Sequence, residues 1–188
     1  MGDGEQERQI YHEKQRLQFC LLHALNNLLQ AGDSFSRVEL DAIAEQLVVD
    51  DPEESSWWTP LSVVFRPHHN RLTGNYDVNV LIAALESRGR RVLWHDRRRG
   101  ASSIGLGAPG EPAAAPPPLE GILLNVPVRK LAGLWKSRHW LTLRQIDGRW
   151  YNLDSDLEEP HPFKDEGDVE GFVDDVLADG GEVLLVLR

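Results

Sequence analysis

The sequence predicts an α+β fold in which helices flank a mainly antiparallel sheet. Helical patterns fill the first half of the chain, whereas strand patterns dominate the second half, with one further helix before the last strand. Asp147-Gly148 lies between two runs of alternating hydrophobicity, which predicts a β-hairpin with a type I′ turn. Because helices and strands are segregated along the chain, their order favours an antiparallel sheet over a βαβ repeat.

Three helices are expected in the first half of the chain. Leucines at i, i+4 and i+7 spacing predict a helix over about residues 19–30. Ser36 and Glu39 have the spacing of a capping box, which predicts a second helix over about 37–48. The same apolar spacing predicts a third helix that begins near Asn75.

The second half of the chain supplies most of the sheet. Strands are expected over about 91–95, 122–126, 139–146, 149–154 and 182–187, with a late helix near 169–176. Pro127 is expected to close the second of these strands, because proline has no N–H to donate to a neighbour. Gly, Ala and Pro dominate residues 105–118, which predicts a surface loop, and the polar residues 1–10 predict a disordered tail.

Composition limits the possible function classes. The 188 residues have the length of one domain, and the net charge of −10 argues against nucleic acid as a partner, because phosphate binding needs a basic face. Cys20 is the single cysteine, which excludes an internal disulfide and cysteine-rich zinc sites. Neither a signal pattern nor a long apolar run is present. We therefore expect no membrane span and an intracellular protein, of the cytoplasm or the nucleus.

Cys20 is the candidate nucleophile. It falls in the first turn of the first predicted helix, where unpaired N–H groups and the positive end of the helix dipole favour a thiolate. A buried structural cysteine is an equally good interpretation of its position alone. A carboxamide five residues earlier, Gln15, could donate a hydrogen bond to the same substrate carbonyl, together with the backbone N–H of Cys20.

A cysteine nucleophile needs a base, and His139 is the favoured one of seven histidines. If Asp147-Gly148 is a two-residue turn, His139 and Asp154 are diagonal neighbours about 7–8 Å apart at the backbone. Their side chains can then form a hydrogen bond that orients the imidazole. The alternative is a surface pair without consequence. His23 lies on the same helical face as Cys20, but its expected role is to anchor that helix by a hydrogen bond.

Taken together, these residues resemble the Josephin family over about residues 10–188. The segments that carry the resemblance are Tyr11-His12-Glu13-Lys14-Gln15, Cys20, 23–30, 74–80, His139-Trp140 and 150–155. The short, stand-alone Josephin-like proteins, including those of plants, are the most similar members. The resemblance implies a papain-like fold with residues 11–188 as its catalytic domain. It also implies a helical hairpin over about 33–72 that gates the ubiquitin tail.

The family consists of cysteine proteases that cleave ubiquitin from conjugates, so the resemblance implies ubiquitin and ubiquitinated proteins as partners. By this resemblance Cys20 is the nucleophile, His139 the general base and acid, Gln15 the oxyanion donor and Asp154 the third residue. No metal or cofactor is implied. The Trp57-Trp58 part of the gating hairpin does not align with the family pattern.

Two other functions remain open at the level of the sequence. One is a ubiquitin-binding module that keeps the fold but turns over slowly or not at all. The other is a different papain-like thiol enzyme, such as an amidase acting on small substrates. The sequence does not indicate linkage preference, cellular targets or oligomeric state.

Overall fold

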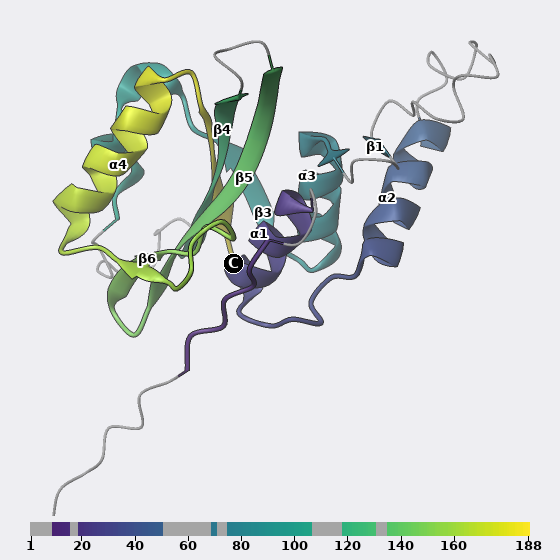
Figure 1. Ribbon diagram of the computed structural model, residues 1–188, viewed down its shortest axis with the longest axis horizontal. Coiled ribbons are helices and arrows are strands. Elements are labelled where there is room, and N and C mark those ends of the chain that lie inside the picture. The colour runs from purple at the N-terminus through teal and green to yellow at the C-terminus, as the bar shows by residue number, and fades with distance from the viewer. Residues whose placement is uncertain (1–8, 16–18, 51–68, 71–74, 107–117, 131–134) are drawn as a thin grey trace, which may run out of the picture.

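A six-stranded antiparallel sheet separates two groups of helices in the computed structural model, which describes residues 9–15, 19–50, 69–70, 75–106, 118–130 and 135–188 (Figure 1). From one edge to the other, the strands are β3 (Arg91–Trp94), β8 (Glu182–Leu187), β4 (Leu119–Lys130), β5 (Trp135–Ile146), β6 (Arg149–Asn152) and β7 (His161–Pro162). Every pairing in it is antiparallel, which confirms the predicted α+β class.

Helices cover both faces of this sheet. Figure 1 shows α1 (Cys20–Leu29), α2 (Arg37–Asp50) and α3 (Val78–Ser87) on one side and α4 (Glu166–Ala178) on the other. The smaller elements are a two-stranded ribbon of β1 (His69–Asn70) and β2 (Asn75–Tyr76), and the 3-10 turns η2 (Arg97–Arg99) and η3 (Ala101–Ile104). Among the described residues, no helix combines the length and apolar character needed to cross a membrane.

Two apolar cores fill the space between the sheet and its helices. In β4, Leu123 packs in the core shared with α1 and α3, whereas Ile122 and Leu124 pack in the core shared with α4. Successive strand residues point to opposite faces, so a strand covered on both faces needs an unbroken apolar run. This explains why consecutive residues in the middle of β4 are apolar instead of alternating with polar residues.

The helices begin and end close to the predicted positions. The Ser36–Glu39 capping box is confirmed, since the Glu39 N–H donates to Ser36 Oγ at 3.3 Å and the Ser36 N–H donates to Glu39 Oε2 at 2.8 Å. Asp77 caps α3, so the segment from Asn75 first forms β2 and the helix starts later than expected. The first helix ends at Leu29 because Gln30 adopts a left-handed conformation, with φ of 57°.

The predicted hairpin is confirmed, including its register. Ile146 pairs with Arg149, and both turn residues, Asp147 and Gly148, have positive φ values of 49° and 81°, as a type I′ turn requires. A glycine in the second position adopts this conformation without steric cost.

The expectation that Pro127 closes its strand is wrong. β4 continues to Lys130, and Pro127 pairs with Arg138 of β5. On the other side of β4, the last residue paired with β8 is Asn125. Pro127 therefore lies where β4 has lost its β8 neighbour, and at such an edge a missing N–H costs no ladder hydrogen bond on the open side.

Several sequence predictions fall outside the described residues. These are most of the tail over 1–10, most of the loop over 105–118, and the Trp57-Trp58 part of the gating hairpin. They stay predictions.

A buried carboxylate ties the end of α1 to the sheet. Glu120 of β4, whose side chain is 3% exposed, accepts from Arg90 at 3.0 Å and lies 3.3 Å from Arg144. Arg144 also donates to the Leu28 carbonyl at the end of α1. Burial raises the pKa of Glu120, but the hydrogen bond from Arg90 and the charges of the arginines outweigh it and lower that pKa.

We expect Glu120→Ala to lower the free energy of unfolding by about 3–5 kcal/mol, because it leaves buried positive charge without its partner. Because the folded-state pKa of Glu120 is depressed, its contribution is present above about pH 4.3 and is lost as the pH falls through the folded-state pKa. Urea titrations at several pH values measure both effects. Glu158→Ala removes an exposed carboxylate paired with Lys14 and is the matched control. An equal response of the two variants would contradict this role of Glu120.

Candidate active site

Cys20 is the first residue of α1, and it is 5% exposed. Among the described residues, no side chain caps the N-terminus of this helix, and the sulfur lies at the positive end of its dipole. The cysteine packs in the same core as Leu21 and Trp140, which fixes its position against the sheet.

His139 of β5 contacts both Cys20 and Asp154. Its Nε2 atom donates to Asp154 Oδ1 at 2.6 Å, and Cys20 is its second side-chain hydrogen-bond partner. Because Nε2 is occupied by Asp154, Nδ1 is the ring nitrogen left for the sulfur. Burial lowers the pKa of His139, but the hydrogen bonds to Asp154 and Cys20 and their negative charges outweigh it and raise the pKa to about 10. The imidazole is therefore protonated at neutral pH.

Asp154 reaches His139 from a loop and not from a strand as the sequence predicted. β6 ends at Asn152, whose side chain accepts from the Asp154 N–H at 2.9 Å and turns the chain out of the sheet. The Asp154 carboxylate also accepts from the Asp156 N–H at 3.0 Å, and the Asp154 carbonyl accepts from His12 at 2.9 Å. The predicted hydrogen bond between His139 and Asp154 is confirmed, although the strand pairing that motivated it is absent.

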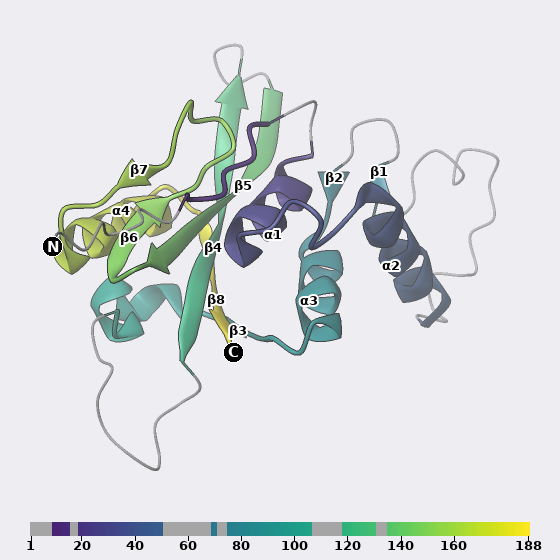
Figure 2. The same ribbon diagram turned by 90° about the horizontal axis from the view of Figure 1, so that it is seen from below.

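Gln15 lies beside the same loop, which we call the β6–β7 loop (residues 153–160). Its backbone N–H donates to the Ser155 carbonyl at 2.7 Å, and its side-chain oxygen accepts from Ser155 Oγ at 3.2 Å. Figure 2 shows residues 9–15, the N-terminal segment, as a purple trace that runs past α1 towards this loop.

Asn27, which is fully buried, joins the N-terminal segment and the β6–β7 loop to the cysteine helix. Its carboxamide accepts from the Glu13 N–H at 2.6 Å and donates to the Leu153 carbonyl at 2.8 Å. Asn27 is seven residues after Cys20, so the two side chains lie two turns apart on one face of α1. The helix that carries Cys20 therefore also holds the two segments that carry Gln15 and Asp154.

The competing histidine, His23, has a structural partner. Its Nδ1 atom lies 2.6 Å from Glu13 Oε2, which confirms the expected anchoring hydrogen bond. Burial raises the pKa of Glu13, but hydrogen bonds from His23, Tyr11 and Asn26 outweigh it and lower that pKa. The carboxylate stays ionised and keeps the N-terminal segment on α1.

Within the described residues, one cluster has the donor atoms for a metal ion: His139, Asp154 and Asp156, whose ligand atoms lie within 4.8 Å of one another. A metal would have to displace the proton that His139 shares with Asp154. Since the pKa of His139 is raised to about 10, that proton is held tightly at neutral pH. The chemistry of the donors therefore favours an imidazolium over a metal ligand.

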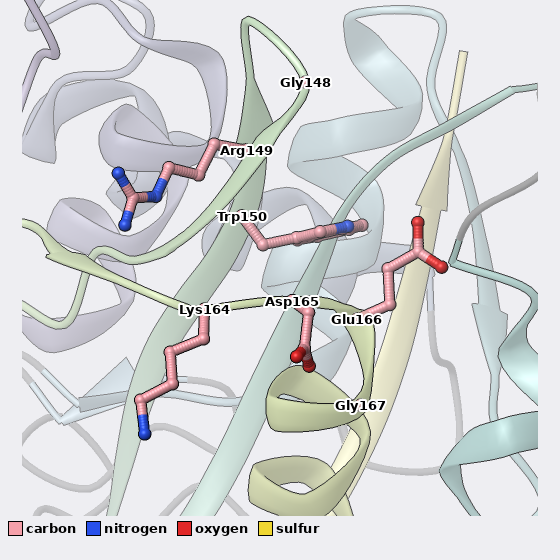
Figure 3. Close-up of a pocket in the computed structure, with 7 residues that line it drawn as sticks. All are labelled: Gly148, Arg149, Trp150, Lys164, Asp165, Glu166 and Gly167. Atoms are coloured by element: carbon pink, nitrogen blue, oxygen red, sulfur yellow. The ribbon is translucent and has the colours of Figure 1, made fainter.

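A cavity of about 350 Å³ lies away from these residues, between the turn before β6 and the start of α4 (Figure 3). Its lining holds two basic and two acidic side chains around Trp150, and Figure 3 shows Arg149 and Lys164 pointing away from the indole. Neither a cysteine nor a histidine lines it, so it holds no counterpart of the Cys20–His139 pair.

The model of the Josephin family matches residues 15–187, which include all four predicted site residues. The chain belongs to the Josephin family.

The Josephin relatives differ in how much of their own length the chain covers. A Josephin-like protein of Arabidopsis thaliana is 55% identical over 93% of this chain but over only 46% of its own length. Josephin-2 of Homo sapiens is 41% identical over 95% of this chain and 86% of its own length. Ataxin-3 of Homo sapiens is 30% identical over 83% of this chain and 39% of its own length. The chain thus spans less than half of the plant relative and most of human Josephin-2.

Sequence reasoning missed three residues that shape this Josephin site: His12, Asn27 and Ser155. The sequence predicted no role for His12, yet its ring donates a hydrogen bond to the Asp154 carbonyl. Asn27 carried a usable signal, because it is a polar residue inside the apolar part of the first helix. Ser155 gave no signal beyond its position next to Asp154.

We expect Asp154→Asn to lower the pKa of His139, because the carboxylate is lost while the burial that lowers this pKa remains. NMR titration of the His139 ring measures the shift. The raised pKa stabilises the folded state fully below about pH 6.5, and this stabilisation fades as the pH rises towards 10. The variant should therefore lose more stability near pH 6 than near pH 10. An unchanged His139 titration would contradict this assignment.

Asn27→Ala should lower the free energy of unfolding by about 1–3 kcal/mol for each buried backbone group it leaves unpaired. The Glu13 N–H and the Leu153 carbonyl are those groups. Hydrogen exchange should also show faster opening of residues 9–15. Asn79→Ala, on the exposed face of α3, is the control. A stability loss no larger than that of the control would contradict the bridging role.

Proposed function

We propose that the protein is a cysteine-type deubiquitinase, which hydrolyses the bond after the C-terminal glycine of ubiquitin in conjugates. The observation that carries the proposal is the contact of His139 with both Cys20 and Asp154 at the start of a helix. Membership of the Josephin family supports it, since members such as ataxin-3 are cysteine deubiquitinases.

The reaction begins with the pair formed by Cys20 and His139. The imidazole holds the proton of the thiol, and the raised pKa of His139, about 10, favours this ion-pair form. The thiolate attacks the carbonyl carbon of the terminal glycine of ubiquitin, and the carbonyl oxygen becomes an oxyanion. The Gln15 carboxamide and the backbone N–H of Cys20 donate hydrogen bonds to it.

Collapse of this intermediate expels the amine of the conjugated protein, which takes the proton from His139. The product is a thioester between Cys20 and ubiquitin. Water, deprotonated by the now neutral His139, attacks the thioester, and collapse of the second intermediate expels the Cys20 thiolate, which restores the ion pair with protonated His139. Asp154 holds the imidazole in the required orientation throughout and stabilises its charged form.

The partners follow from this reaction. They are ubiquitin and ubiquitinated proteins, and we propose that the enzyme meets them in the cytoplasm or the nucleus. The amino-acid composition, with a net charge of −10, supports a protein partner over nucleic acid.

Substitution of the reacting residues tests the proposal. We expect Cys20→Ala to abolish hydrolysis of a ubiquitin C-terminal amide, because no other group can form the thioester. His139→Ala should lower kcat by several orders of magnitude, as loss of a triad member does in related chemistry. His23→Ala should have a much smaller effect on kcat, since its imidazole anchors Glu13.

Circular dichroism of each variant separates loss of chemistry from loss of folding. If folded Cys20→Ala hydrolyses the substrate at the wild-type rate, the nucleophile is wrong. If wild type binds ubiquitin but shows no hydrolysis, the protein is a binding module. Hydrolysis of small amides without hydrolysis of the ubiquitin substrate would instead support a different thiol amidase.

A further inference from the structure

Ser155 follows Asp154 directly and holds Gln15 through two hydrogen bonds. Its carbonyl accepts from the Gln15 backbone N–H at 2.7 Å, and its hydroxyl donates to the Gln15 side-chain oxygen at 3.2 Å. Ser155 is 3% exposed, so water cannot readily replace this hydroxyl. The serine thus fixes both the backbone and the side chain of the same glutamine.

A carboxamide has an accepting end and a donating end, and the two cannot be exchanged without turning the group over. An oxyanion is stabilised by the NH₂ end and repelled by the oxygen. Since the Ser155 hydroxyl donates to the oxygen of Gln15, that oxygen is held on the side of the β6–β7 loop. The NH₂ group is then left on the opposite side, where no described residue accepts a hydrogen bond from it.

We propose that Ser155 is a positioning residue for the oxyanion donor, which selects the orientation of the Gln15 carboxamide that presents NH₂ to the substrate carbonyl. This inference rests on the proposed function and assigns a residue to it.

The two residues before Ser155 are both held by hydrogen bonds. Asp154 is hydrogen-bonded to His139 and His12, and the Leu153 carbonyl accepts from Asn27 of α1. One dipeptide, Asp154-Ser155, therefore orients the base with its first side chain and the oxyanion donor with its second. A shift of this dipeptide would disturb both groups at once.

A double-mutant cycle tests the coupling between Ser155 and Gln15. Loss of an oxyanion donor costs roughly 10²–10³ in kcat, so Gln15→Ala and Gln15→Glu should both fall in this range. Gln15→Glu keeps an acceptor for Ser155 but removes the NH₂ donor. Ser155→Ala should lower kcat by at least about 10-fold with little change in KM, because misorientation acts on the transition state.

In the Gln15→Ala background, Ser155→Ala should have almost no further effect on kcat, since the group it orients is gone. If Ser155 only stabilised the fold, Ser155→Ala would lower kcat by the same factor in wild type and in Gln15→Ala. Ser103→Ala, which removes an exposed hydroxyl from η3, is the matched control and should leave kcat unchanged.

NMR of the Gln15 side-chain NH₂ group gives a second measurement that does not depend on turnover. Its resonances should shift and broaden in Ser155→Ala and stay unchanged in Ser103→Ala. Equal effects of Ser155→Ala on kcat in both backgrounds, or unchanged Gln15 NH₂ resonances, would overturn the inference. If wild type hydrolyses no ubiquitin substrate, the proposed function fails, and the NMR result alone decides whether Ser155 orients Gln15.

Discussion

The hydrogen bond between His139 and Asp154 is the interaction on which the rest of the site depends. It keeps a buried imidazole protonated, with a pKa of about 10, next to the sulfur at the start of a helix. Without the carboxylate, burial would lower the pKa of that imidazole, and the positive partner of a thiolate would be lost. The fold therefore has to hold a loop carboxylate within 2.6 Å of a strand residue.

Asn27 shows how the fold meets this constraint. It lies 126 residues from Leu153 along the chain, yet its side chain bonds the Leu153 carbonyl and the Glu13 N–H. A fully buried polar residue on the cysteine helix thus connects the N-terminal segment to the β6–β7 loop. Buried carboxamides are costly unless both ends are paired, so this bridge favours one arrangement of the three segments over any shifted one.

Local patterns made much of this architecture predictable. The Asp147-Gly148 turn fixed the hairpin register, and the Ser36–Glu39 spacing marked the start of α2, because both depend on neighbours in the sequence. The path of the chain after Asn152 was not predictable, since it depends on a side chain of α1 and on His12. The predicted hydrogen bond between Asp154 and His139 is present, but the predicted strand pairing does not produce it, because the Asp154 side chain reaches the ring from a loop after β6.

The most direct test of the central claim is the reaction of the protein with ubiquitin that carries an electrophile at its C-terminus, followed by mass spectrometry of the modified peptide. The account predicts one covalent adduct, on the Cys20 sulfur, that forms quickly in wild type and slowly in His139→Ala. An adduct on another residue, or no adduct although ubiquitin binds, would contradict it.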